Sequence, residues 1–293
     1  MFFVVVGTRR NRNASSQQGG GGGARVDTGQ PTLFTFNIVK EFDHDPRAFT
    51  QGFEVYHSKD NGPTFIESTG LRGRSSVREV DIATGKVLRS TDLIRTDFGE
   101  GITRLGDTLY QLTWQSPRLI SYNVHDFSKQ QVHKTSLKDG WGITNDGSRL
   151  ILGDSSHVLY FVDPKTMKVV DTIDVTDADK PVAWLNELEW VDGLIYANIW
   201  QRECIAQIEP TTGNIVGWID LSGITRKVRA ASKEKIDVLN GIAWDGEDGT
   251  LYITGKLWPK VYQIELRPMY VDSKTTHVKE MTESVRQRCI VSS

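Results

Sequence analysis

The chain has 293 residues, of which 38% are hydrophobic and 25% are charged, and its formal net charge is -2. This composition is typical of a folded domain, and the near-neutral net charge gives no electrostatic argument for nucleic-acid binding. The histidines are scattered, and neither a Cys-x-x-Cys nor a His-Glu-x-x-His pattern occurs. The sequence therefore lacks the ligand spacing typical of a catalytic transition-metal site.

The first 31 residues differ in kind from the rest of the chain. Met1 to Val6 are apolar, but this run is much shorter than a membrane span. Gly19 to Gly23 form a glycine run without the Lys-Ser/Thr pair of a phosphate-binding loop, so a flexible linker is the simpler interpretation. Asn13 begins a glycosylation sequon, which matters only in a secreted protein. We predict a disordered leader and linker over residues 1–31 and no membrane span.

Five internal repeats, about 40 to 55 residues apart, occupy most of the remaining chain. Each begins with a polar or aromatic residue, usually followed by Gly and then by a large apolar residue. The five starts are Gln51-Gly52-Phe53, Glu100-Gly101-Ile102, Trp141-Gly142-Ile143, Asn186-Glu187-Leu188 and Asn240-Gly241-Ile242. This spacing suits one four-stranded blade per repeat and is too long for a single hairpin.

The fourth repeat illustrates the pattern inside each unit. Leu188 leads through an Asp192-Gly193 turn to a second apolar strand, because Asp-Gly tolerates the positive φ of a tight hairpin. Third and fourth strands follow over residues 204–209 and 214–220, with alternating apolar residues and no long helical periodicity. The fifth repeat supplies only three strands, the last over residues 260–266.

The missing strand stands before the first repeat. Phe34 to Lys40 occupy the position of a fourth strand, so we assign them to the last blade. That pairing closes the ring and leaves no open sheet edge between the first and last blades. We therefore predict an all-β fold, a five-bladed β-propeller over residues 32–268 that is closed by an N-terminal strand.

Residues 269–293 form a C-terminal tail. Val278, Met281, Val285 and Cys289 recur at helical spacing, which favours a short amphipathic helix packed against a blade. Cys204 lies in a predicted strand, and nothing in the sequence establishes whether it pairs with Cys289.

One mouth of the channel should collect the variable residues of the repeats. The start of the first strand and the end of the second lie on the same side of the ring, because the chain runs down and returns. The residues are Gln51, Glu100, Trp141, Asn186 and Asn240 at the starts, and Trp114, Ser155, Trp200 and Lys256 at the ends. A carboxylate, a lysine, three carboxamides and three tryptophans around one opening indicate a binding or catalytic site.

Each of these residues also has a purely structural interpretation. A single Trp is more often part of a core, and only the shared edge favours function for the three together. Asn240 could satisfy backbone groups at a strand start, Lys256 could extend into solvent, and Gln51 could bond the neighbouring blade. Glu100 lies between two glycines that leave its carboxylate uncovered, so we expect a functional role for it.

Several blocks of the sequence closely resemble plant-type glutaminyl cyclases (glutaminyl-peptide cyclotransferases). The blocks are residues 47–52, 98–103, 110–114, 184–189, 239–244 and 254–256. The resemblance extends from about Phe34 to Leu266 and implies a five-bladed propeller that converts the N-terminal Gln of peptides into pyroglutamate with loss of ammonia. The site residues that it implies are Phe49, Gln51, Phe98, Glu100, Trp114, Trp141, Asn186, Trp200 and Lys256.

The resemblance also implies the setting of the reaction. Catalysis would need no metal, although a structural calcium ion could lie in the propeller channel, for which no ligand set can be read from the sequence. The partners would be peptides or proteins with an N-terminal Gln, and we expect a monomer. A secretory, extracellular or vacuolar location is implied, although the short apolar start of this chain departs from the family's secretory leaders.

The chemistry of these residues agrees with such a reaction. The α-amine must be neutral to attack the side-chain amide carbon, and ammonia must leave protonated, so one acid/base can serve both ends. Glu100 is the candidate. Lys256 and Asn186 can stabilise the oxyanion of the tetrahedral intermediate. The five aromatic residues can fold the Gln side chain into an attack geometry, and Gln51 can orient the amide.

Two other functions are compatible with the same fold. A propeller could bind peptides or proteins on this face without catalysis, and an assay for ammonia release separates that function from cyclisation. A metal-dependent lactonase-type propeller requires clustered carboxylates at the channel. Only Glu100, Glu187 and Glu189 come near one another, and strand alternation points Glu187 and Glu189 away from the direction of Asn186.

Overall fold

The structure is a computed structural model that describes residues 30–58, 62–269 and 275–291. Nearly all of the predicted leader and linker, including Asn13, lies outside the described residues. Strands dominate, and the helices of the described chain are α1 (Ile224–Ala231) and α2 (Thr275–Cys289). Neither helix combines the length and the apolar character needed to cross a membrane, within the residues that the structure describes.

Three four-stranded antiparallel sheets follow one another along the chain. The first contains β2 (Thr50–Ser58), β3 (Gly62–Thr69), β4 (Ser76–Asp81) and β5 (Val87–Asp92). The second contains β6 (Gly99–Leu105), β7 (Thr108–Thr113), β8 (Arg118–Asn123) and β9 (Lys129–Lys134). The third contains β10 (Ile143–Asn145), β11 (Leu150–Gly153), β12 (Val158–Val162) and β13 (Val169–Asp174).

The remaining long strands form one eight-stranded sheet in the order β16-β17-β18-β19-β1-β22-β21-β20. The strands of the fourth repeat are β16 (Leu185–Val191), β17 (Leu194–Ile199), β18 (Cys204–Ile208) and β19 (Ile215–Asp220). The others are β20 (Leu239–Asp245), β21 (Thr250–Gly255), β22 (Lys260–Pro268) and β1 (Thr32–Asp43). A short ribbon of β14 (Thr176–Asp177) and β15 (Lys180–Pro181) stands apart.

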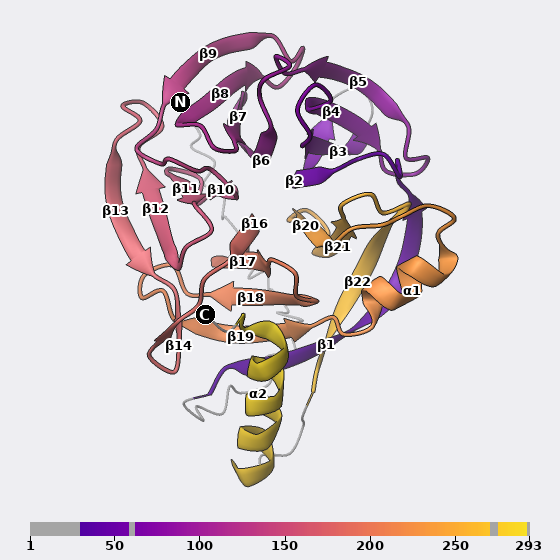
Figure 1. Ribbon diagram of the computed structural model, residues 1–293, viewed down its shortest axis with the longest axis vertical. Coiled ribbons are helices and arrows are strands. Elements are labelled where there is room, and N and C mark those ends of the chain that lie inside the picture. The colour runs from indigo at the N-terminus through magenta and orange to yellow at the C-terminus, as the bar shows by residue number, and fades with distance from the viewer. Residues whose placement is uncertain (1–29, 59–61, 270–274, 292–293) are drawn as a thin grey trace, which may run out of the picture.

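The sheets are arranged radially about a central axis (Figure 1). The first strand of each repeat, β2, β6, β10, β16 or β20, lies nearest the axis, and β5, β9 and β13 lie at the outside. This propeller-like arrangement confirms the predicted all-β class. Strand starts at the axis are therefore brought together from five distant parts of the chain.

The N-terminal strand β1 closes the ring as predicted, and it also pairs with a strand of the fourth repeat. β1 pairs antiparallel with β22 from Phe34 opposite Pro268 to Asp43 opposite Lys260. Its first residues, Thr32 to Phe34, also pair in parallel with Gly217 to Ile219 of β19. The sequence predicts a pairing with the last repeat alone, because a parallel pairing between distant strands has no local signal. The added pairing joins two repeats into one sheet.

The core lies between neighbouring sheets rather than at the axis. Ile66 and Val77 of the first sheet pack with Ile102, Leu109 and Ile120 of the second, and all five are almost fully buried. Each such side chain contributes roughly 1.5–3 kcal/mol when removed from water. The period-2 pattern of the strands therefore builds a ring of small cores, which accommodates a chain of this length.

The inner strands touch one another at the glycines that follow the variable residues. A Cβ added to Gly52 would lie 2.3 Å from the backbone nitrogen of Ile102, in the next repeat. A Cβ added to Gly142 would lie 1.9 Å from the carbonyl oxygen of Asn186. Glycine is required here because any side chain would hold adjacent repeats apart at the axis.

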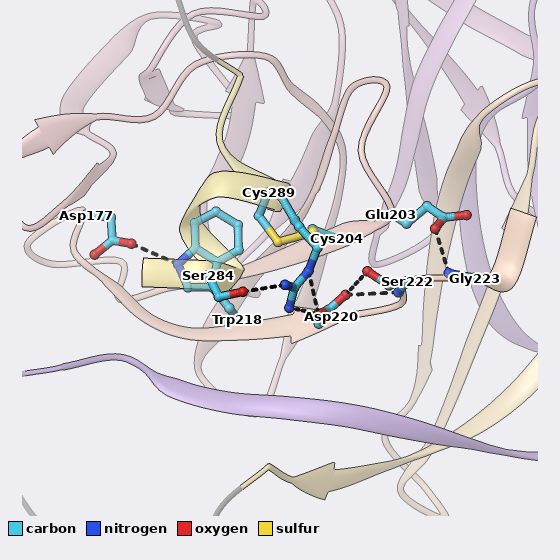
Figure 2. Close-up of a disulfide and its surroundings, with 10 residues drawn as sticks. Asp177, Glu203, Cys204, Trp218, Asp220, Ser222, Gly223, Ser284 and Cys289 are labelled. Atoms are coloured by element: carbon cyan, nitrogen blue, oxygen red, sulfur yellow. Dashed lines mark hydrogen bonds and ion pairs between the residues drawn. A yellow bond between two sulfur atoms is a disulfide. The ribbon is translucent and has the colours of Figure 1, made fainter. Parts of the chain in front are cut away.

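The tail forms the helix that its spacing predicts. Val278, Val285 and Cys289 of α2 are buried. Cys289 is joined to Cys204 of β18 by a disulfide with a Cα–Cα distance of 5.5 Å (Figure 2). This pairing was left open by the sequence because 85 residues separate the two cysteines. The disulfide attaches the tail to the outer part of the fourth repeat.

Helix α1 was not anticipated, since the sequence analysis found no long helical period inside the repeats. It connects β19 to β20 and spans only two turns, from Ile224 to Ala231. Its two buried residues, Ile224 and Val228, are four positions apart and face the same side. Two apolar residues at helical spacing are too few to distinguish a helix from a loop in the sequence.

The close approach of the inner strands predicts a sharp difference between two glycines of the third repeat. Gly142→Ala should lower the free energy of unfolding by about 2 kcal/mol or more, because its methyl group would meet the Asn186 carbonyl. Gly153→Ala is the matched control, since its Cβ would find its nearest neighbour at 3.5 Å and its φ is not positive. Urea denaturation followed by circular dichroism measures both. Equal stability of the two variants would contradict the packing argument.

Candidate functional site

All nine site residues inferred from the sequence line a single cavity of about 250 Å³. They are Phe49, Gln51, Phe98, Glu100, Trp114, Trp141, Asn186, Trp200 and Lys256. Two further residues predicted at this mouth, Ser155 and Asn240, do not line it.

The blade geometry explains how residues so far apart meet. Gln51 and Glu100 are the second residues of β2 and β6, and Asn186 is the second residue of β16. Trp200 and Lys256 directly follow β17 and β21. First-strand starts and second-strand ends thus share one end of the ring, as predicted. Figure 1 shows β2, β6 and β16 converging on the axis.

Aromatic rings form two walls of the cavity. On one side, Phe98 lies between Phe49 and Trp114, with ring centroids 5.9 Å and 5.3 Å away. On the other side, Trp141 and Trp200 meet edge to face at 5.8 Å. These contacts pack the walls into fixed positions and leave a largely apolar surface between them.

Trp184 packs against two of the wall tryptophans but does not itself line the cavity. Its ring lies 5.2 Å from that of Trp200 and 6.3 Å from that of Trp141. Its backbone amide donates to the carbonyl of Ser155 at 2.7 Å. The sequence contains a signal for Trp184, because this residue stands two positions before Asn186 in one of the blocks that resemble the family.

Glu100 is the acidic group of the cavity and is only 3% exposed. Its Oε1 accepts a hydrogen bond of 2.7 Å from Nε2 of Gln51. Its Oε2 has no hydrogen-bond partner among the described residues. Burial raises the pKa of Glu100 well above the ordinary value, Lys256 and the Gln51 bond oppose that rise, and the charge of Asp139 adds to it. A carboxyl group with a raised pKa can both release and accept a proton near neutral pH.

Lys256 is the basic group of the cavity and is 5% exposed. Its Nζ lies 5.0 Å from the centroid of the Phe49 ring, a cation–π contact. Burial lowers the pKa of Lys256, while the charges of Glu100 and Asp237 partly restore it. The alternative interpretation, in which Lys256 extends into solvent, is wrong, because the side chain is buried against an aromatic wall.

Two more polar groups complete the site. Asn186 is 1% exposed, and its Oδ1 accepts no hydrogen bond from any described residue. Asp139, which the sequence analysis missed, accepts a 3.3 Å hydrogen bond from Nε1 of Trp141. Asp139 lies in a loop without a motif, so only the tertiary structure reveals its effect on Glu100.

Below the cavity, Glu187 occupies the position that glycine holds in the other four repeats. Its carboxylate accepts hydrogen bonds from the amides of Phe53, at 3.3 Å, and Ile242, at 2.9 Å. Glu189 similarly accepts from the amide of Trp244 at 2.9 Å. Neither glutamate lines the cavity, in agreement with the strand alternation. Glu187 thus joins inner strands of three repeats across the channel.

The channel carboxylates accept hydrogen bonds from backbone amides of neighbouring strands. Burial raises the pKa of Glu54 to about 7. Burial raises the pKa values of Glu187 and Glu189 well above the ordinary range, with added repulsion from Glu189 and Glu54 on Glu187 and from Glu54 on Glu189. Glu187 uses both oxygens on backbone amides, and Glu54 accepts from the amide of Arg104 at 2.8 Å. Within the described ranges, no three His, Cys, Asp or Glu side chains are grouped closely enough to hold a metal ion.

Comparisons with known proteins identify the family. The sequence profile of the glutamine cyclotransferase family matches residues 13–266. A glutaminyl-peptide cyclotransferase of Arabidopsis thaliana is 47% identical over 230 residues, which cover 78% of this chain and 71% of that protein. The crystal structure of Myxococcus xanthus glutaminyl cyclase superposes with a TM-score of 0.76 at 32% identity, covering 83% of this chain and all of that one.

The raised pKa values in the channel predict that stability falls as the pH rises. Glu54 is protonated more readily in the folded state, so its contribution is complete below its ordinary pKa of 4.5 and is lost as the pH passes about 7. The loss is roughly 3 kcal/mol for that shift, and Glu187 and Glu189 act in the same direction.

Urea denaturation from pH 5 to pH 8.5 measures this effect, and Glu54→Gln should flatten the profile. Glu67 has the opposite sign, since its pKa is lowered to about 2, but its contribution is lost only below pH 4.5 and leaves this window unaffected. A stability that is constant or rises across the window would refute the assigned direction.

Proposed function

We propose that this chain, which belongs to the glutamine cyclotransferase family, is a glutaminyl-peptide cyclotransferase that converts the N-terminal Gln of peptides and proteins into pyroglutamate with release of ammonia. One observation carries the proposal. A buried glutamate with a raised pKa, a buried lysine and an asparagine with an unfilled acceptor stand in one aromatic cavity.

The reaction is an acyl transfer within the substrate. The α-nitrogen attacks the carbon of the side-chain amide, so that a C–N bond forms to the α-nitrogen and the C–N bond to the departing nitrogen breaks. Glu100 accepts the proton that the α-amine must lose and returns it to the departing nitrogen, which leaves as ammonia. One carboxyl group suffices because the reaction releases and consumes one proton. Its raised pKa supports this shuttle near neutral pH.

Lys256 and Asn186 stabilise the negative charge that develops on the amide oxygen. The ammonium of Lys256 is held in a desolvated position, where its attraction for an oxyanion exceeds that of a lysine in water. The Nδ2 of Asn186 can donate to that oxygen, and its free Oδ1 supplies an acceptor for a substrate N–H. Together with Glu100, these polar groups come from three different repeats.

The aromatic walls supply proximity. A free glutamine side chain samples many rotamers, and cyclisation needs the one that brings the α-nitrogen to the amide carbon. Phe49, Phe98 and Trp114 on one side, with Trp141 and Trp200 on the other, confine that side chain. The cavity opens at the mouth of the ring, so the rest of a peptide can extend outward into solvent.

The finer features of the enzyme remain part of the proposal. We propose a five-bladed propeller, and the strand order, in which β1 lies between β19 and β22, supports it. We expect a monomer in a secretory, extracellular or vacuolar location, and the Cys204–Cys289 disulfide supports an oxidising compartment. The structural calcium ion stays a prediction, and the channel carboxylates would have to rearrange to bind it.

The alternative is a propeller that binds peptides at this mouth without changing them. The same aromatic walls would serve that function, but binding alone gives no reason to bury Glu100 and Lys256 together at a desolvation cost. Release of ammonia from Gln-Gln in a coupled assay decides between the two functions.

Glu100→Gln tests the acid/base assignment. We expect turnover of a Gln-peptide to fall by about 10²–10⁴-fold, because the amide cannot exchange a proton, while the thermal midpoint changes little. Gln fits the same space and can still bond to Gln51. Near-wild-type ammonia release from a folded variant would refute the role of Glu100.

Chelation tests metal independence. Glu100 and Lys256 provide an acid/base and a cation without a metal ion, so treatment with phenanthroline or dipicolinate should leave the ammonia release rate unchanged. A zinc-dependent hydrolase assayed in parallel shows that the chelator is active. Complete loss of activity that zinc restores would overturn the metal-independent reaction.

A further inference from the structure

We infer that Asn240 is a positioning residue, which orients the Gln51 amide so that Oε2 of Glu100 is the oxygen that exchanges protons with the substrate. The inference rests on the proposed role of Glu100. It concerns a residue outside the cavity that acts only through Gln51.

Asn240 lies beneath Gln51 and is completely buried. It is the second residue of β20, and its Nδ2 makes two hydrogen bonds. One of 3.0 Å goes to the backbone carbonyl of Thr50, and one of 3.2 Å goes to Oε1 of Gln51. The first bond is the backbone role that a strand-start asparagine can have. The second connects Asn240 to the catalytic cavity.

The Thr50 carbonyl determines which way the Asn240 amide faces. A backbone carbonyl can only accept a hydrogen bond, so the atom of Asn240 that faces it must be the Nδ2 donor. Thr50 is itself held in place, because its hydroxyl donates at 2.6 Å to Glu67, a carboxylate with no exposed surface. Glu67 in turn is held by Arg78 and His44. The anchor is therefore rigid.

The orientation of the Asn240 amide determines the orientation of the Gln51 amide. Since Nδ2 of Asn240 is a donor, the Gln51 atom opposite it must be the acceptor Oε1. The other end of the Gln51 amide is then Nε2, which donates to Oε1 of Glu100 at 2.7 Å. If the Gln51 amide were turned by about 180°, its Nε2 would face the Nδ2 donor of Asn240. The Oε1 of Gln51 would then face the Glu100 carboxylate, where two acceptors would oppose each other.

The result distinguishes the two oxygens of Glu100. Oε1 already accepts a hydrogen bond from Gln51, which lowers its affinity for a proton relative to Oε2. Oε2 has no partner among the described residues, and Glu100 lines the cavity. The proton taken from the α-amine therefore resides on Oε2, which is free to return it to the departing nitrogen.

Three variants test this inference through the pH profile of kcat. In Asn240→Asp, the new carboxylate cannot donate to the Thr50 carbonyl, and it favours a Gln51 amide turned by about 180°. The turned amide presents its Oε1 to Glu100, and this oxygen can form a hydrogen bond only with a protonated Glu100. We expect kcat to fall by about tenfold or more and the acidic limb to move up by about one pH unit, with KM little changed. Asn240→Leu should lower kcat with a smaller shift of the limb.

Asn198→Leu is the matched control. Asn198 is equally buried, and its Oδ1 accepts from the amide of Gly241 at 2.9 Å, but no bond connects it to Gln51. It should lower the thermal midpoint and leave the acidic limb in place. The charged groups that act on Glu100 are Lys256 and Asp139, with Asp237 acting on Lys256, and none of these is altered in the three variants.

A double-mutant cycle separates positioning from general damage. In a Gln51→Leu background, Asn240→Leu should change kcat by no more than about twofold, because the residue through which it acts is gone. This cycle decides the question even where the Asp variant fails to fold. Additive losses, or acidic limbs identical to wild type in both Asn240 variants, overturn the inference.

Glu100→Gln distinguishes the failure of this inference from the failure of the proposed function. If Glu100→Gln is inactive and the Asn240 variants keep the wild-type profile with additive losses, only the positioning role is wrong. If Glu100→Gln remains active, the acid/base assignment and the inference fall together.

Discussion

The close approach of the inner strands at the axis is the constraint on which the rest of the structure depends. Gly52 and Gly142 leave no space for a Cβ against the backbone of the next repeat. Because these glycines directly follow Gln51 and Trp141, the same contacts that close the ring also place the variable residues beside one another. In the fourth repeat, Glu187 replaces the glycine and joins the inner strands through hydrogen bonds to Phe53 and Ile242 instead.

A ring this tight produces a cavity that is small and largely apolar. Inside it, burial raises the pKa of Glu100 and lowers the pKa of Lys256, so that the two groups are drawn toward the same pH range. In water, a glutamate and a lysine differ too much in pKa for either to shuttle protons readily near neutrality. The reactivity of the site thus follows from packing, since the aromatic walls that exclude water also shift the titration of its charged groups.

The polar groups behind the cavity determine how the charged ones are presented. Hydrogen bonds lead from the buried Glu67 through Thr50 and Asn240 to Gln51 and Glu100. Each member leaves its neighbour only one satisfactory orientation. Glu100 must accept and return a proton at one position, so it benefits from a fixed Gln51 amide. If that amide rotated freely, either oxygen of Glu100 could be the one without a hydrogen bond.

The class of fold, the closing strand and seven of the nine cavity residues could be predicted from the repeat pattern, because a β-meander is a local structure in which period-2 alternation and turn residues establish the side of the ring that each strand end must reach. The same pattern also predicted Ser155 and Asn240 at the mouth, and they do not line the cavity. Phe49 and Phe98 came from the family resemblance alone. Only the tertiary structure decided the parallel pairing of β1 with β19, the Cys204–Cys289 disulfide and the bonds of Asn240 to Thr50 and Gln51. These contacts join residues far apart in the chain, and such contacts depend on distances that no local pattern encodes.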